Sequence, residues 1–223
     1  MATAGPMATP TDTAVLTLTQ WLSPAYPVGG FAYSHGLEAA IDAGAVTTVQ
    51  DTGAWIADVL EHGAGWNDAV FLVAAHRAGD AGALAGIDAT ARAFCASSER
   101  VMETHFLGQA FGSVTGDVWD FELGGLAYPV AVGHAARLQN LPLLLTTQIF
   151  LQAFMSNLVA CATRLVPLGQ TEAQRLIREL TPLCAQLAEQ SLAAGLDDLS
   201  STAFLADIAS MKHETQYSRI FRT

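Results

Sequence analysis

The sequence predicts an all-α protein, a single-domain helical bundle of roughly eight to ten helices. Alanine and leucine dominate the composition, which favours helix over strand. No run of β-branched residues alternates with polar residues at the period of a strand. The chain has 223 residues and is 51% hydrophobic, which is ample apolar material for the core of one large domain.

The first part of the chain divides into three expected helices and one structured turn. Residues 12–22 carry apolar side chains at helical spacing behind a possible capping aspartate. The turn 23–31 (SPAYPVGGF) contains two prolines and two glycines, and a helix does not tolerate them at that density. We expect Ser34 to cap a helix over 34–44. A further helix over 48–63 begins with a capping pattern and carries one apolar face.

Glycine-containing breaks separate the helices expected in the middle of the chain. A helix over 66–78 places apolar residues on its inward side, and helices over 83–94 and 97–112 follow. Residues 116–125 are acidic and contain glycine, so we expect a loop there. A helix over 128–139 begins at Tyr-Pro, because proline is favoured in a first turn.

The last three expected helices span 141–166, 171–194 and 200–211. The first of them contains an uncharged run long enough to span a bilayer. Polar side chains interrupt that run at every fourth residue: Gln148, Gln152 and Ser156. We therefore interpret it as the central helix of a soluble protein. The helix over 171–194 is amphipathic, and Pro182 is expected to kink it.

Three segments make up the predicted domain organisation. Residues 1–11 are small and polar, with neither the basic residues nor the apolar run of a signal peptide, and we expect them to be disordered. Residues 12–211 form the helical domain. Residues 212–223, which we call the C-terminal tail, follow it as a separate segment.

Charge and cysteine content exclude several classes of function. A net charge of −11 leaves no domain-sized basic face for nucleic acid, and it disfavours anionic membrane surfaces. Only 14% of residues are charged, which is typical of a surface that a partner or a second copy covers. Cys95, Cys161 and Cys184 are odd in number and widely spaced, so we expect buried free thiols in a reducing cytoplasm.

The pair Ser34-His35 is the first candidate for catalysis. A nucleophilic serine needs a base across space, and adjacent Ser and His side chains usually diverge. We favour a rigid turn in which Pro27, Gly29 and Gly30 shape the backbone, with no catalytic residue. A helical hydrolase using Ser34 or His35 stays open as an alternative.

Histidine spacing argues against a metal site within one chain. Metal ligands on a helix lie three or four residues apart, and no pair of histidines has that spacing. The histidines are His35, His62, His76, His105, His134 and His213. A site shared across a dimer interface stays open. The acidic residues are expected to be solvated.

The turn and the tail are the predicted partner-docking surfaces. Three of the ten basic residues lie in the tail, beside apolar side chains of the kind that anchor interfaces. Aromatic side chains of the turn, expected to be exposed, would suit the same role. The candidate partner-binding residues are Tyr26, Phe31, Tyr33, Ser34, Lys212, His213, Tyr217, Arg219, Ile220, Phe221 and Arg222. If the tail is disordered when free and folds on binding, removing 212–223 should abolish docking and leave the helical body folded.

Four segments resemble the UreF family of urease accessory proteins. They are LSPAYPVGGFAYSHGLE (22–38), YPVAVG (128–133), RLVPLGQ (164–170) and DIASMKHETQYSRIFR (207–222). Their order and spacing over nearly the whole chain fit that family. The match departs at Lys212, where members often have arginine, which keeps the charge but loses the bidentate guanidinium.

The resemblance implies an all-helical, homodimeric protein that is not an enzyme. Such a protein binds the accessory protein UreD (UreH in some organisms) and the GTPase UreG, and the assembly docks on urease apoprotein. The complex inserts nickel in a GTP-dependent step, so the resemblance implies no stably bound cofactor on this chain. It also implicates the C-terminal segment and the region of the first helix in the UreD contact. A direct nickel carrier is the alternative.

Overall fold

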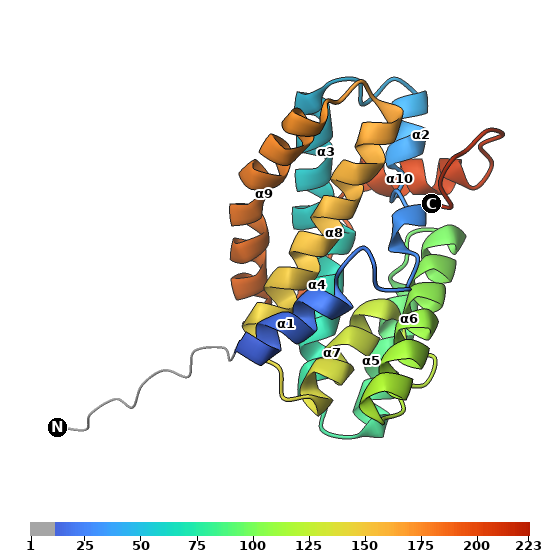
Figure 1. Ribbon diagram of the computed structural model, residues 1–223. Coiled ribbons are helices and arrows are strands. Elements are labelled where there is room, and N and C mark those ends of the chain that lie inside the picture. Colours follow the sequence, from blue (N-terminus) through green and yellow to red (C-terminus); the bar gives the residue numbers. More distant parts are fainter. Residues whose placement is uncertain (1–11) are drawn as a thin grey trace.

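The computed structural model describes residues 12–223, and in this range the chain forms a bundle of α-helices with no strand (Figure 1). The expected disorder of residues 1–11 lies outside the described residues. The α-helices are α1 (Asp12–Trp21), α2 (Leu37–Asp42), α3 (Val49–His62), α4 (Ala64–Arg77), α5 (Ala81–Ala93), α6 (Ser98–Trp119), α7 (Tyr128–Leu138), α8 (Leu143–Leu165), α9 (Gln170–Ser191) and α10 (Phe204–His213). Two 3-10 helices, η1 (Gly30–Ala32) and η2 (Leu196–Asp198), lie between them. The predicted fold class is confirmed.

Short polar residues fix where several helices begin. Thr48 and Asp51 form a capping box at the start of α3, in which each side chain accepts a hydrogen bond from the other residue's backbone N–H. Asp80 accepts from the backbone of Ala83 at 2.8 Å and so begins α5. Ser97 caps α6 in the same way.

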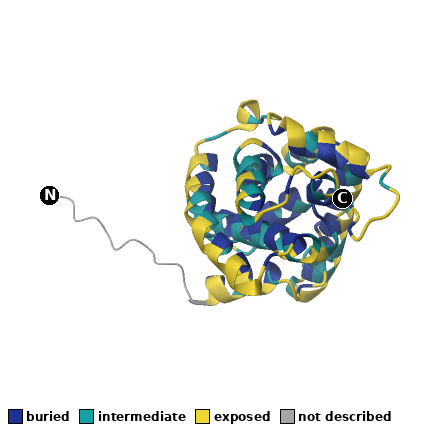
Figure 2. Cartoon of the chain, turned by 90° about the horizontal axis from the view of Figure 1, so that it is seen from above, coloured by how far each residue is buried: buried dark blue, intermediate teal, exposed yellow. Residues whose placement is uncertain are grey.

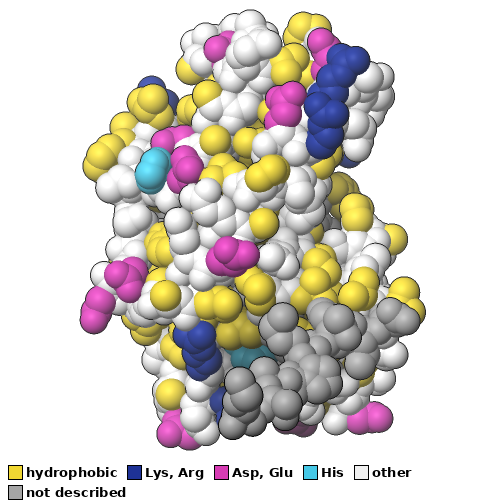
Figure 3. All heavy atoms as spheres, turned by 90° about the vertical axis from the view of Figure 1, so that its left-hand side faces the viewer, with side chains coloured by type: hydrophobic (Ala, Val, Ile, Leu, Met, Phe, Trp, Pro, Cys, Tyr) yellow, Lys and Arg dark blue, Asp and Glu magenta, His cyan; other side chains and the backbone are white. Residues whose placement is uncertain are grey.

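Helix α8 connects the two largest parts of the hydrophobic core. Leu151 and Met155 pack with residues of α3, α9 and α10, whereas Phe150 packs with residues of α1, α6 and α7. Buried residues therefore gather where the helices face one another, and exposed residues lie on the outside (Figure 2). On the face shown in Figure 3, acidic side chains and fewer basic ones lie scattered among exposed apolar patches.

Helix α8 is the one helix in the described range that is long and apolar enough to cross a membrane. In the structure it contacts α9, α4, α3, α2, α7 and α1. It thus lies within the bundle, as the interpretation as a central helix requires.

Helix α6 is longer than predicted. We expected it to end at Gly112 and a loop to follow over 116–125, but the helix continues to Trp119. Glycines at every fourth position, Gly108, Gly112 and Gly116, let the returning chain lie directly against the helix. A Cβ on any of them would meet backbone oxygens of segment 121–126. The glycines that indicated a break instead allow close packing.

We predict that Gly108→Ala destabilises the fold, because the added Cβ would clash with the carbonyl oxygen of Leu126. The expected loss in the free energy of unfolding is about 3 kcal/mol or more, measured by urea denaturation. Gly86→Ala is the matched control, since this exposed glycine inside α5 has open space around it. It should stabilise the protein by about 0.5 to 1 kcal/mol. Equal effects of the two substitutions would contradict this account of α6.

Candidate functional site

The turn 23–31 does not display its aromatic side chains as expected. Tyr26 and Tyr33 are buried, at 7% and 5% exposure, and the expectation that they lie at the surface was wrong. Tyr26 packs against Phe111, and its hydroxyl shares a hydrogen bond of 2.8 Å with Thr115. Only Phe31 of the three is exposed, at 61%. The turn therefore offers a single aromatic anchor to a partner.

The backbone of the turn depends on its glycines. Gly29 has a φ of 78°, a left-handed conformation that residues with a Cβ rarely adopt. Gly30 follows as the first residue of η1, and Pro27 is exposed beside them.

Ser34 is fully buried, and α2 begins later than expected, at Leu37 after Gly36. The Ser34 hydroxyl oxygen still accepts a hydrogen bond from the backbone N–H of Glu38 in the first turn of α2, at 3.3 Å. The same hydroxyl donates to the carbonyl oxygen of Thr223, and the Ser34 backbone N–H donates to that oxygen at 2.8 Å. The His35 ring faces Glu103. Ser34 and His35 are therefore engaged with different partners, and the structure does not favour a serine nucleophile with His35 as its base.

The C-terminal tail leaves α10 as a loop that projects from the bundle, and its last residues return to the helical body (Figure 1). Its first two residues, Lys212 and His213, are the last residues of α10. Phe221 is 3% exposed and lies 5.7 Å beneath the guanidinium of Arg164. The backbone N–H of Arg222 donates to the carbonyl oxygen of Ala32 at 2.7 Å. The tail is thus pinned to η1 and α8.

Glu38 binds the tail most extensively. Its carboxylate accepts hydrogen bonds from the backbone N–H groups of Ile220, at 2.7 Å, and Phe221, at 2.8 Å. The same carboxylate lies 3.2 Å from Nε2 of His213. On the other side of this ring, Nδ1 lies 2.7 Å from Glu99, which also accepts from Arg219 at 2.5 Å. We call Glu38, Glu99, His213 and Arg219 the tail cluster.

A second ion cluster lies deeper in the bundle. Glu103 accepts from Arg100 at 2.6 Å, from Nε2 of His35 at 2.9 Å and from the Thr223 hydroxyl at 3.0 Å. Asp68 lies 3.7 Å from Arg100. We call Asp68, Arg100, Glu103 and His35 the deep cluster. It holds the last residue of the tail.

Burial and neighbouring charges give the two carboxyl groups of the deep cluster different pKa values. Burial alone would raise the pKa of Glu103, but Arg100 and His35 outweigh it and lower that pKa to about 2. Burial raises the pKa of Asp68 to about 7, and Arg100 opposes this only in part. Burial also lowers the pKa of His35. Glu103 is therefore the ionised partner of Arg100, whereas Asp68 binds a proton near neutral pH.

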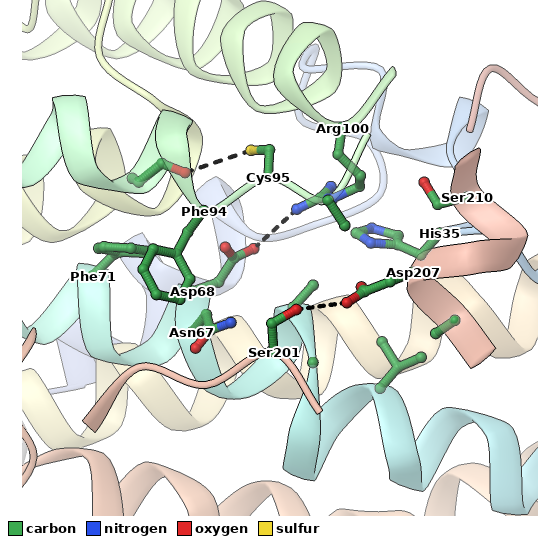
Figure 4. A pocket seen from close by; sticks show the side chains of 16 residues that line it. His35, Asn67, Asp68, Phe71, Phe94, Cys95, Arg100, Ser201, Asp207 and Ser210 are labelled. Carbon is green, nitrogen blue, oxygen red and sulfur yellow. Dashed lines mark hydrogen bonds and ion pairs between the residues drawn. The ribbon is translucent and has the colours of Figure 1, made fainter. Parts of the chain in front are cut away.

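Two cavities meet at the deep cluster. The larger, of about 640 Å³, lies between the turn, α6, α7 and α8, and its lining is mainly apolar. The smaller, of about 50 Å³, lies on the side of α10 (Figure 4). Asp68, Arg100 and His35 line both cavities. In Figure 4 these three side chains converge from α4, α6 and the turn before α2.

An apolar face with basic neighbours remains exposed on α10 and the tail. The inner side of α10 is buried, whereas its outer side carries four exposed apolar residues: Phe204, Leu205, Ile208 and Met211. Tyr217 is fully exposed and Ile220 is 66% exposed. The basic residues Lys212, Arg219 and Arg222 are exposed beside them. We call these nine residues the docking face.

Sequence reasoning missed most of the residues that hold the tail. The acidic residues were expected to be solvated, yet Glu38 and Glu103 are buried. His213 and Phe221 were assigned to partner contact but are also buried, at 0% and 3% exposure. Glu38 lies inside the segment 22–38 that carried the family resemblance, and this was the one signal available for it. In the described range, no group of three His, Cys, Asp or Glu side chains is placed to hold a metal ion.

Fold and site together define an all-helical protein whose buried ion clusters hold its own C-terminal tail against the bundle. A family model described as UreF matches residues 46–181, which is more than half of the chain. The chain belongs to the UreF family of urease accessory proteins.

Relatives named urease accessory protein UreF cover almost the whole chain. The one from Ruegeria pomeroyi is 61% identical over 217 residues, which are 97% of this chain and 100% of the relative. The one from Roseobacter denitrificans is 51% identical over 94% of both chains. The one from Rhodopseudomonas palustris strain HaA2 is 44% identical over 100% of this chain and 99% of the relative.

We predict that Asp68 makes the fold less stable as pH rises. Its folded pKa of about 7 exceeds the ordinary value of 3.8, so between these values the folded state holds a proton that the unfolded state has released. Stability therefore falls with rising pH, by at most about 2 to 3 kcal/mol between pH 5 and pH 8. Asp68→Asn should remove this fall in urea denaturation at the two pH values. Asp42→Asn, at an exposed carboxyl, should keep it, and an unchanged profile in Asp68→Asn would refute the assignment.

Proposed function

We propose that this protein is a non-catalytic scaffold in the maturation of urease. In this proposal it binds UreD (UreH in some organisms) and the GTPase UreG, and the assembly docks on urease apoprotein for GTP-dependent nickel insertion. The observation that carries the proposal is the docking face, in which exposed apolar residues lie beside Lys212, Arg219 and Arg222 in an otherwise acidic chain. Membership of the UreF family supports it.

The chemistry of the docking face supports a protein partner. Glu38 fixes the backbone at Ile220, so little conformational entropy remains to be lost there on binding, and Tyr217 is exposed in the loop before it. The complementary surface is expected to combine apolar and acidic groups, because the docking face combines exposed apolar and basic side chains. Phe31, at the edge of the larger cavity, is a second candidate anchor.

We further propose that the protein acts in the cytoplasm as a homodimer and that the complex, not this chain alone, handles nickel. The low charge content of the chain, 14% of residues, supports coverage of its surface by another chain. Sedimentation of the purified protein tests the homodimer directly. Nickel titration of the same sample tests the competing possibility of a direct carrier, for which tight stoichiometric binding would be the outcome.

The ordered tail changes how docking should be tested. Removing 212–223 deletes the buried side chains of His213 and Phe221, so truncation is now expected to destabilise the body as well as to abolish docking. Point variants at exposed positions avoid this difficulty.

We predict that Tyr217→Ala combined with Ile220→Ala weakens partner binding at least tenfold and leaves the free energy of unfolding within about 0.5 kcal/mol of the parent. The measurement is co-purification with UreD, UreG and apo-urease, followed by nickel-dependent activation of urease with and without the chain. Val118→Ala is the matched control, because Val118 is 60% exposed at the opposite end of α6 from the tail contact. Undiminished binding and activation in the double variant would overturn the role of the docking face.

A further inference from the structure

His213 occupies an unusual position between two carboxylates. Its side chain is fully buried, Nε2 lies 3.2 Å from Glu38 and Nδ1 lies 2.7 Å from Glu99. A neutral imidazole has one N–H and one lone pair, so it can donate to only one of these carboxylates. With a single proton, the lone pair of the other nitrogen would face a carboxylate oxygen. Both contacts are favourable only when the ring carries both protons.

The charge of the tail cluster leads to the same conclusion. Glu38 and Glu99 contribute two negative charges and Arg219 one positive charge, so the cluster has a net charge of −1 with a neutral ring and 0 with imidazolium. The ring and the Glu38 carboxylate are buried, so an unbalanced charge between them is costly. The chain neighbours of His213, Lys212 and Glu214, are exposed, and Glu214 accepts from the backbone of Ser98. The groups facing the ring from α2, α6 and the tail are therefore Glu38, Glu99 and Arg219.

The same two carboxylates bind the tail. Glu38 accepts the backbone N–H groups of Ile220 and Phe221, and Glu99 accepts the Arg219 guanidinium. Arg219 also donates to the carbonyl oxygen of His213 at 3.3 Å. The orientation of both carboxylates thus depends on the ring between them.

We propose that His213 is a proton-dependent latch for the C-terminal tail. The doubly protonated ring holds Glu38 and Glu99 in position to bind the tail, and loss of one proton breaks a contact and releases residues 219–221. The position of Tyr217 and Ile220 on the protein surface would then depend on pH, whichever partner binds them. The inference rests on the geometry of the tail cluster and not on the proposed role in urease maturation.

The other histidine near the tail does not offer the same device. His35 donates through Nε2 to Glu103, and its Nδ1 has no hydrogen-bond partner. This arrangement suits a neutral ring, and burial lowers the pKa of His35 in the same sense. Asp68, whose pKa burial raises to about 7, contacts Arg100 in the deep cluster and not the Ile220 and Phe221 amides. The amides that Glu38 binds therefore report on His213.

The test follows the ring and the tail in the same full-length protein. Nitrogen-detected NMR reports the protonation of the His213 ring between pH 5.5 and 8.5. Hydrogen exchange, corrected for its intrinsic pH dependence, reports the protection of the Ile220 and Phe221 amides. We expect both signals to change at one midpoint, with amide protection falling at least tenfold. A neutral ring in the closed protein, or protection that stays constant while the ring loses its proton, would overturn the proposal.

Two variants separate the latch from a general effect of pH. His213→Gln cannot carry charge, so the tail amides should be poorly protected at every pH, without a midpoint. His62→Gln, at the exposed end of α3, should behave like the parent. If His213→Gln does not fold, the NMR titration of the parent still decides between the outcomes. Partner binding is not part of this readout, so failure of the scaffold proposal and failure of the latch remain distinguishable.

Discussion

The carboxylate of Glu38 is the group on which the arrangement of α10 and the C-terminal tail depends. It lies on α2, it is 5% exposed, and it accepts hydrogen bonds from two tail amides while facing His213 at the end of α10. A buried carboxylate is stable only when donors surround it, and here the tail supplies them. The close approach of α10 to Gly36, where a Cβ would meet the backbone of Ser210, brings His213 within reach. The pairing of Glu38 with His213 therefore depends on the close contact between α10 and Gly36.

The distribution of charge explains both the interior and the surface. Only 14% of residues are charged, and the tail cluster and the deep cluster place several of them inside the bundle. The surface is left with few charges, and the apolar outer side of α10 is exposed among them. Buried ion pairs add little net stability compared with apolar packing, but they penalise alternative arrangements strongly. In this chain they specify one position for the tail, and so they fix the side chains that it exposes.

Much of the fold could be predicted from local patterns, because caps and apolar spacing act within a few residues. Thr48, Asp80 and Ser97 mark the starts of α3, α5 and α6 through contacts with the next turn of their own helices. The length of α6 could not be predicted, because Gly108 and Gly116 are explained only by the chain that packs on them. The burial of Tyr26 and Glu103 depends on partners many residues distant, such as Thr115 and Thr223. Composition singled out the tail, but its division into buried and exposed residues follows from distant partners such as Glu38, Glu99 and Glu103.

Helix α8 contributes residues to two hydrophobic clusters, and this affects how the protein unfolds. Two hydrophobic clusters would ordinarily allow two parts of a bundle to open separately, each with its own free energy. Because consecutive residues of one helix, Phe150 and Leu151, belong to different clusters, neither cluster can lose its packing while α8 stays intact for the other. The bundle should therefore behave as a single cooperative unit, with one calorimetric transition over both clusters. Partly unfolded species that expose the apolar surface of α8 would then stay rare, which protects a helix of this composition from aggregation.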